Sequence, residues 1–232
     1  MDADDPRFLV AAAARILSRE GCASNVGGQV SVRAEGGAGA FWVFGYEYFD
    51  QATPDRVALV DQDLQVLEGR FKLPAAMGTL ARIYSERPDV NAIIHLHSHY
   101  LTVLSGTGRP VGMYDISAVL FHDDQATYAD DGRKPHNSVV DALGDRRLVL
   151  IKNHGAIVAS ESLRRATVES ITLEESARIH LESEAAGASE IAPDEVARGK
   201  GAYRLLYLEH MWEANWERLA RSDPDLWNRI EG

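Results

Sequence analysis

Three histidines alternate along one apolar segment of the sequence. The segment 93–99 reads Ile-Ile-His-Leu-His-Ser-His, which places an imidazole at His95, His97 and His99. Successive side chains of a β-strand point to opposite faces, so in a strand all three imidazoles leave the same face. Burying them without partners is costly, and a divalent metal satisfies them because histidine is its commonest protein ligand. The segment therefore predicts a metal-binding strand.

A further histidine follows a second apolar segment far downstream. His154 stands in the segment 150–156, which reads Leu-Ile-Lys-Asn-His-Gly-Ala. With His95 and His97 it supplies three nitrogen ligands and leaves coordination positions open for substrate or water, which is typical of a catalytic metal. For His99 three roles stay open: a fourth ligand, a proton-transfer group, or the first exposed residue after the strand. We favour the last two.

Composition and charge narrow the class of protein. The chain has 232 residues and a formal net charge of -11, and its pI is about 5.2. A length of this order suits one domain, expected over residues 1–232, and the negative charge argues against nucleic acid or an anionic membrane as partner. The single cysteine, Cys22, excludes an intramolecular disulfide and a cysteine-based zinc site. The acidic first residues and the lack of a long apolar run predict a cytoplasmic protein.

The order of apolar patterns predicts an α/β protein. Strands and helices are interspersed, and several strands form apparent hairpins, which indicates a mixed sheet flanked by helices. The expected strands are 29–33, 41–44, 57–60, 64–67, 92–97, 148–152 and 156–159. The expected helices are 6–17, 74–86, a short one from 99, 137–143, 162–186 and 193–220. The segment 106–135 has the least regular pattern.

Three motifs, in this order, resemble those of one family. The segment 28–33 reads Gly-Gln-Val-Ser-Val-Arg, 87–98 reads Arg-Pro-Asp-Val-Asn-Ala-Ile-Ile-His-Leu-His-Ser, and 152–155 reads Lys-Asn-His-Gly. They resemble the glycine turn, the metal strand and the third-ligand motif of the class II aldolase/adducin family. The resemblance implies a three-layer αβα fold with a mostly antiparallel sheet. It also implies zinc, or another divalent ion, on His95, His97 and His154.

The sequence departs from the sugar-phosphate aldolases of that family. Where they have Pro-Ser-Ser-Glu, residues 74–77 read Pro-Ala-Ala-Met, so Met77 takes the place of the Glu that binds metal and moves protons. A thioether cannot transfer a proton and is a poor ligand for a hard ion. Gln29 replaces the family's Asn, whereas Gly28 and Ser31 remain. We expect Gly28, Gln29, Ser31 and Met77 to contact substrate, and we do not expect fuculose- or ribulose-phosphate as that substrate.

The three-histidine site favours a carbon–carbon lyase. The sequence resembles the family's decarboxylases more than its sugar-phosphate aldolases. A three-histidine metal polarises a hydroxyl or ketone next to a carboxylate and stabilises the enolate or carbanion left by bond cleavage. We therefore expect a decarboxylase, or otherwise an aldolase, acting on a small non-phosphorylated hydroxy or oxo acid or a hydroxy-aromatic acid. One divalent metal per subunit is expected, zinc first, with manganese, cobalt or iron(II) as alternatives.

Several residues are candidates for the proton donor. His99 is one candidate, and the resemblance adds Tyr203 or Tyr207, because a C-terminal tyrosine of an adjacent subunit reaches the metal in relatives. Further candidates are Tyr46, Tyr48, His122 and Tyr128, and Asp123 or Asp124 is a candidate for the carboxylate missing at position 77. The glutamates of the long helix, Glu174, Glu175, Glu182 and Glu184, are interpreted as a solvated face.

Two other functions compete with a lyase. A non-haem iron(II) oxygenase performing oxidative decarboxylation fits three histidines without a carboxylate. An adducin-like interaction module without catalysis is the third interpretation, and retention of all three histidines weighs against it. The resemblance also implies a homotetramer with active sites at subunit interfaces.

Overall fold

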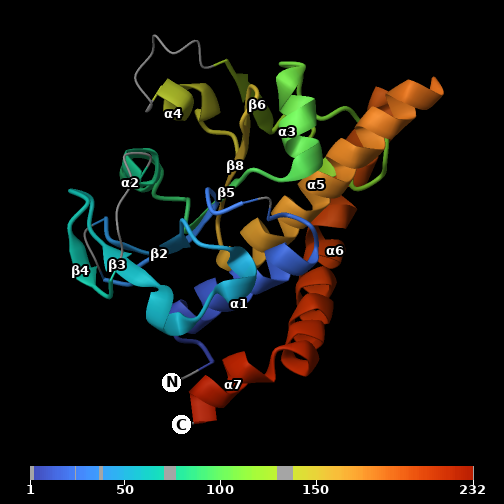
Figure 1. The fold of residues 1–232 in the computed structure, drawn as a ribbon. Coiled ribbons are helices and arrows are strands. Elements are labelled where there is room, and N and C mark those ends of the chain that lie inside the picture. The colour runs from blue at the N-terminus through green and yellow to red at the C-terminus, as the bar shows by residue number, and fades with distance from the viewer. Residues whose placement is uncertain (1–2, 24, 37–38, 71–76, 130–137, 232) are drawn as a thin grey trace.

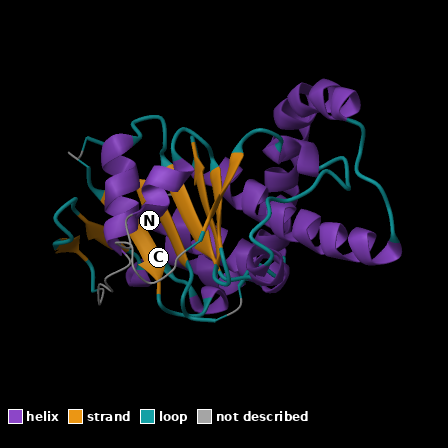
Figure 2. Ribbon diagram, turned by 90° about the horizontal axis from the view of Figure 1, so that it is seen from above, coloured by secondary structure: helices purple, strands orange, loops and turns teal. Residues whose placement is uncertain are grey.

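Among the residues that the structure describes, eight strands form one mixed sheet between two layers of helices (Figures 1 and 2). The computed structural model describes residues 3–23, 25–36, 39–70, 77–129 and 138–231. The strand order is β4-β3-β2-β1-β5-β8-β7-β6. The strands are β1 Gln29–Arg33, β2 Phe41–Gly45, β3 Ala58–Val60, β4 Val66–Glu68, β5 Ala92–Leu96, β6 Gln125–Tyr128, β7 Leu148–Ile151 and β8 Gly155–Ser160.

The helices cover both faces of this sheet. They are α1 Pro6–Arg19, α2 Met77–Glu86, α3 His99–Gly106, α4 Ser138–Leu143, α5 Leu163–Ala186, α6 Pro193–Ser222 and α7 Pro224–Glu231, with 3-10 turns at Phe49–Gln51, Pro54–Arg56 and Ala118–Phe121. The larger core lies between one face and α1, α3, α5 and α6. The smaller core lies between the other face and α2 and α4. This three-layer arrangement confirms the predicted class of fold.

Strand β5 shows how the alternation of side chains divides the two cores. Ala92, Ile94 and Leu96 belong to the larger core, whereas Ile93 belongs to the smaller one. Because side chains alternate, His95 leaves the sheet on the side of Ile93. The strand lies in the middle of the sheet, antiparallel to β1 and to β8. A central strand flanked on both edges is a rigid base for a functional side chain.

The sheet is mostly antiparallel, as predicted, with one exception in the segment expected to be irregular. Strand β6 pairs with β7 in parallel, whereas every other strand pair among the described residues is antiparallel. The sequence of β6, Gln-Ala-Thr-Tyr, has no apolar alternation that marks a strand. Two parallel strands need a long connection, and here it includes helix α4 between β6 and β7. The pairing of these strands is therefore recognised only from the folded structure.

The C-terminal region extends the helical layer beyond the prediction. Helix α6 continues to Ser222, beyond the expected end at residue 220, and a further helix, α7, begins at Pro224. Proline is compatible with the first turn of a helix, because the N–H that it lacks has no intrahelical partner there. Across the described residues, no helix combines the length and the apolar character needed to cross a membrane.

Candidate metal centre

The three predicted ligands lie near the ends of neighbouring strands. His95 lies within β5, His97 directly follows it, and His154 lies in the tight turn between β7 and β8. In that turn Asn153 has a left-handed φ of 57°, a conformation that asparagine tolerates better than most residues. Gly155, which follows His154, opens β8 with a φ of 150°, and a Cβ there would lie 2.0 Å from the Leu96 carbonyl oxygen. Glycine therefore permits the close approach that places His154 beside β5.

The three imidazoles form a compact cluster. The Nε2 atoms of His95 and His97 are 3.2 Å apart, and the ring of His154 lies 5.1 Å from that of His95 and 4.6 Å from that of His97, between centroids. One nitrogen from each residue lies within 4.8 Å of the other two. His95 is buried, His97 is half-buried and His154 is exposed. The cluster is therefore reached by solvent from the side of His154.

This donor set fits a divalent metal. At zinc–nitrogen bonds of about 2.0–2.1 Å, two tetrahedral ligand atoms lie about 3.3 Å apart, close to the 3.2 Å between the Nε2 atoms. Burial lowers the pKa of His95, and burial together with His154 lowers the pKa of His97 to about 4. Both rings are therefore neutral near pH 7 and offer lone pairs. Among the described residues no carboxylate joins the cluster, so a metal held by the three histidines would keep positions open for other ligands.

A hollow of about 450 Å³ opens above the histidines. It is lined by Asn25, His97, His99, Thr102, Val103, Asn153 and His154. This volume suits a small organic molecule. His99 is the first residue of α3 and is exposed. The structure therefore places this candidate proton donor in the same hollow as two of the three predicted ligands.

A buried glutamate holds the segment that carries the histidines, and the sequence analysis missed it. Glu174 of α5 is only 6% exposed, so it was wrong to assign it to a solvated face. Its carboxylate accepts hydrogen bonds from the Ser98 hydroxyl and from the N–H groups of Tyr100 and Leu101. It thereby satisfies donors in the first turn of α3, which lack intrahelical partners. Helical periodicity in a polar stretch gave no signal for this contact.

The residues predicted to contact substrate lie mostly inside the protein. Gln29 is 1% exposed, and its side chain contacts His95. The Ser31 hydroxyl bonds to Tyr84 and to the Ile93 carbonyl, and Met77 lies fully buried in the smaller core. Gly28 is also buried. Their roles toward a substrate stay predictions, and none of the four lines the hollow described above.

The other candidate proton donors are scattered. Tyr46 is 36% and Tyr48 54% exposed. Burial raises the pKa of Tyr46, and its hydrogen bond to Gln29 offsets part of that rise. Tyr128 is buried in the smaller core. Tyr207 packs half-buried against its own larger core, whereas the side chain of Tyr203 lies outside the described part of the chain.

The carboxylates considered as replacements for the missing glutamate are engaged elsewhere. Asp124 pairs with Arg147, and Asp123 lies beside His122. Neither belongs to the cluster that the described residues form around His95. The hypothesis that one of them approaches the metal therefore finds no support in the structure.

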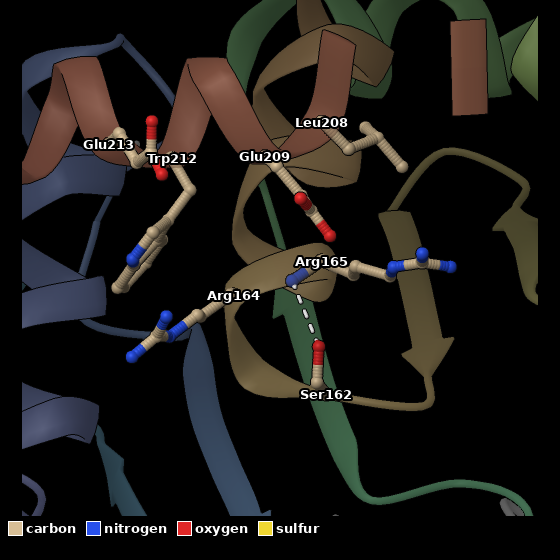
Figure 3. A pocket seen from close by; sticks show the side chains of 7 residues that line it. All are labelled: Ser162, Arg164, Arg165, Leu208, Glu209, Trp212 and Glu213. Atoms are coloured by element: carbon tan, nitrogen blue, oxygen red, sulfur yellow. Dashed lines mark hydrogen bonds between the residues drawn. The ribbon is translucent and has the colours of Figure 1, made fainter. Parts of the chain in front are cut away.

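A second hollow lies at the other end of β8 (Figure 3). It measures about 240 Å³ and is lined by Ser162, Arg164, Arg165, Leu208, Glu209, Trp212 and Glu213. The guanidinium of Arg164 lies 5.8 Å from the Trp212 ring centroid, and two glutamates balance the two arginines. The six-residue strand β8 spans about 20 Å between this hollow and the histidines. Among the described residues, its glutamates belong to no cluster of potential metal ligands, and its opposite charges balance one another.

Known proteins with similar sequences include a decarboxylase and an oxygenase. The chain is 30% identical over 236 residues to "Decarboxylase NovR" of Streptomyces niveus, covering 95% of this chain and 86% of the relative. It is 29% identical over 208 residues to "4-hydroxy-3-prenylphenylpyruvate oxygenase/4-hydroxy-3-prenylbenzoate synthase" of Streptomyces roseochromogenus subsp. oscitans, covering 84% and 74%.

A solved structure shares the fold. The L-fuculose 1-phosphate aldolase from Glaciozyma antarctica PI12 superimposes with a TM-score of 0.83 at 23% identity, covering 93% of this chain and 90% of the aldolase. The family model "Class II Aldolase and Adducin N-terminal domain" matches residues 9–181, a range that contains all three histidines. The chain belongs to the class II aldolase/adducin family.

Proposed function

We propose that this protein is a divalent-metal-dependent carbon–carbon lyase, and specifically a decarboxylase of a small non-phosphorylated hydroxy or oxo acid or hydroxy-aromatic acid. An aldolase reaction on the same class of acid is the nearest variant. The observation that carries the proposal is the three-histidine cluster, open to a hollow on one side. The similarity to a decarboxylase over 95% of the chain supports it.

The residues that would hold the metal are His95, His97 and His154, with zinc as the first candidate and manganese, cobalt or iron(II) as alternatives. A bound divalent ion supplies Lewis-acid polarisation of a hydroxyl or carbonyl oxygen next to the scissile bond. Decarboxylation then needs an electron sink and a later proton donor, and it needs no base to begin. That requirement is compatible with a buried thioether at Met77 in place of an acidic residue.

The residues of the hollow supply the remaining functions. His99 would deliver the proton that replaces the departing carboxyl group, and its position in the same hollow as His97 and His154 supports this role. The amides of Asn25 and Asn153 offer hydrogen bonds to substrate oxygens, and Val103, 49% exposed, offers an apolar contact for a ring or chain. In a homotetramer, part of our proposal, a neighbouring subunit would complete the open side.

A second candidate function is an iron(II) oxygenase. The similarity to a relative named as an oxygenase favours it, and three histidines with open positions also suit iron. The two candidates differ in metal and in their need for dioxygen. An interaction module without metal is the remaining alternative.

Metal analysis and turnover with and without oxygen test the proposal. The protein is purified without added metal, its metal content is measured, and it is incubated with hydroxy-aromatic and 2-oxo acids. Zinc, manganese or cobalt with release of carbon dioxide under anaerobic conditions supports the lyase. Iron with strictly oxygen-dependent turnover would contradict the lyase and support the oxygenase. A protein with no metal and no turnover would contradict both proposed enzymes.

Two histidine variants sharpen this experiment. His154→Ala removes one predicted ligand, and we expect metal content to fall at least tenfold. His210→Ala changes an exposed histidine on α6, and its metal content is expected to equal that of the wild type. Unchanged metal content in His154→Ala would overturn the proposed site.

A further inference from the structure

The amide of Gln29 connects the backbone of one strand with the first predicted ligand of another. Gln29 lies in β1 directly opposite His95 in β5. Its Oε1 lies 2.9 Å from His95 Nδ1, and its Nε2 donates to the Gly27 carbonyl at 2.5 Å. Gln29 is 1% and His95 is 7% exposed. The contact between Gln29 and His95 is therefore shielded from competing water.

These contacts determine which way the amide faces. A backbone carbonyl only accepts hydrogen bonds, so the NH₂ group of Gln29 must face Gly27. Its Oε1 then faces His95, and an amide oxygen also only accepts. The nearby Tyr46 hydroxyl can donate or accept, so it does not constrain this orientation.

The orientation of the amide in turn determines the tautomer of the imidazole. His95 Nδ1 must carry the hydrogen, since it faces an acceptor. In the neutral ring the lone pair then belongs to Nε2. That atom is the one 3.2 Å from His97 Nε2, within the cluster.

We propose that Gln29 is a positioning residue that holds His95 in its Nδ1–H tautomer and directs Nε2 toward the centre of the cluster. The inference rests on the proposed metal binding. A hydrogen bond to the second nitrogen of a ligating imidazole fixes the orientation of the ring and raises its basicity. This role takes the place of the substrate contact expected for Gln29 from the sequence.

The packing around Gln29 leaves room for a long side chain. Gly45 of β2 is paired with Gln29, and a Cβ at Gly45 would lie 2.7 Å from the Gln29 Cγ. An asparagine is one methylene shorter and would not span from the Gly27 carbonyl to His95. The absence of a side chain at Gly45 therefore leaves the space that the longer side chain of Gln29 occupies.

Zinc affinity of matched variants tests the proposal. Gln29→Met keeps the length of the side chain and removes the acceptor, whereas Gln29→Glu keeps an acceptor for His95. Gln51→Met, at an exposed glutamine, is the control. Dissociation constants for zinc are measured by competition with a chromophoric chelator, and unfolding of the metal-free proteins is measured in parallel. Imidazole ¹⁵N–¹H NMR reports the tautomer of His95.

We expect Gln29→Met to bind zinc about 10- to 100-fold more weakly than the wild type, and Gln29→Glu to bind it more tightly than Gln29→Met. The wild type should show a hydrogen-bonded His95 Nδ1–H signal that Gln29→Met lacks. Gln51→Met should match the wild type in both measurements.

Two results would overturn the inference while leaving the proposed function intact. One is zinc binding by Gln29→Met that is as tight as in the wild type. The other is equal weakening in Gln29→Met and Gln29→Glu with the His95 signal unchanged, which indicates a role in folding alone. A wild type that binds no divalent metal contradicts the proposed function itself, and with it the metal-directing role of Gln29.

Discussion

The carboxylate of Glu174 accepts a hydrogen bond of 2.6 Å from the Ser98 hydroxyl, and both residues are buried. Ser98 stands between His97 and His99, at the point where β5 ends and α3 begins. The same carboxylate accepts the N–H groups of Tyr100 and Leu101. Helix α5 therefore fixes the direction in which the chain leaves β5.

Replacing the carboxylate of Glu174 is expected to destabilise the fold. Glu174→Gln exchanges one accepting oxygen for a donor that faces N–H or O–H groups, so we expect a loss of about 1–3 kcal/mol in the free energy of unfolding. Urea denaturation measures it. Glu175→Gln, at the exposed neighbour paired with Arg178, should change it by less than about 0.5 kcal/mol. Equal effects of the two variants would contradict this account.

Arg33 joins the end of β1 to the loop that leads into β5. Its guanidinium donates to the carbonyls of Tyr84, Arg87 and Val90 and lies 5.0 Å from the Tyr84 ring centroid. A lysine ammonium cannot reproduce this planar array of donors. We expect Arg33→Lys to lower the free energy of unfolding by about 1–3 kcal/mol.

A matched arginine provides the control for that measurement. Arg56→Lys alters an exposed ion pair with Glu47, which is expected to contribute less than about 1 kcal/mol. If Arg33→Lys and Arg56→Lys unfold at the same urea concentration as the wild type, the carbonyl contacts of Arg33 do not stabilise the fold.

Strand β5 and its histidines were predictable from the sequence because their signal is local. Alternating apolar residues and histidines define both the strand and the face that His95 leaves. His154 was predictable for the same reason, since an apolar run and a glycine surround it. Glu174 and strand β6 were not. A glutamate on a polar helix looks solvated until the helix is placed, and a short strand without apolar alternation is recognised only beside its partner β7. For Gln29, the departure from the family motif was visible, but its contact with His95 depends on the register of β1 and β5.

Gly155 is expected to be intolerant of any side chain. A Cβ there would lie 2.0 Å from the Leu96 carbonyl oxygen, a backbone atom that cannot move without disturbing β5. The φ of 150° adds backbone strain for other residues. We expect Gly155→Ala to cost on the order of 3 kcal/mol of unfolding free energy and to weaken metal binding, because His154 precedes it.

Gly78 offers the comparison for this variant. It lies within α2, and a Cβ there would meet no atom within 4 Å. Alanine is favoured over glycine in a helix by about 1 kcal/mol, so Gly78→Ala should be as stable as the wild type or more so. A Gly155→Ala protein as stable as Gly78→Ala would show that the β5–β8 contact adapts.

Glu184 makes the stability of the folded protein depend on pH in the acidic range. Both of its carboxylate oxygens accept hydrogen bonds of 2.7 Å from the Arg109 guanidinium. This contact, with a smaller effect of His180, lowers the pKa of Glu184 from 4.5 to about 2. Because the folded state holds this carboxylate ionised more readily than the unfolded state, its contribution to stability is present above about pH 4.5. That contribution disappears as the pH falls toward 2.

Carboxyl ¹³C NMR of Glu184, together with unfolding at several pH values, measures this effect. We expect Glu184→Gln to lose less stability than the wild type between pH 4.5 and 2, and Arg109→Met to bring the pKa of Glu184 back toward its ordinary value. The pair is exposed to solvent, so high salt should also raise this pKa. A Glu184 that titrates near 4.5 in the wild type at low salt would mean that the Arg109 contact does not persist in solution.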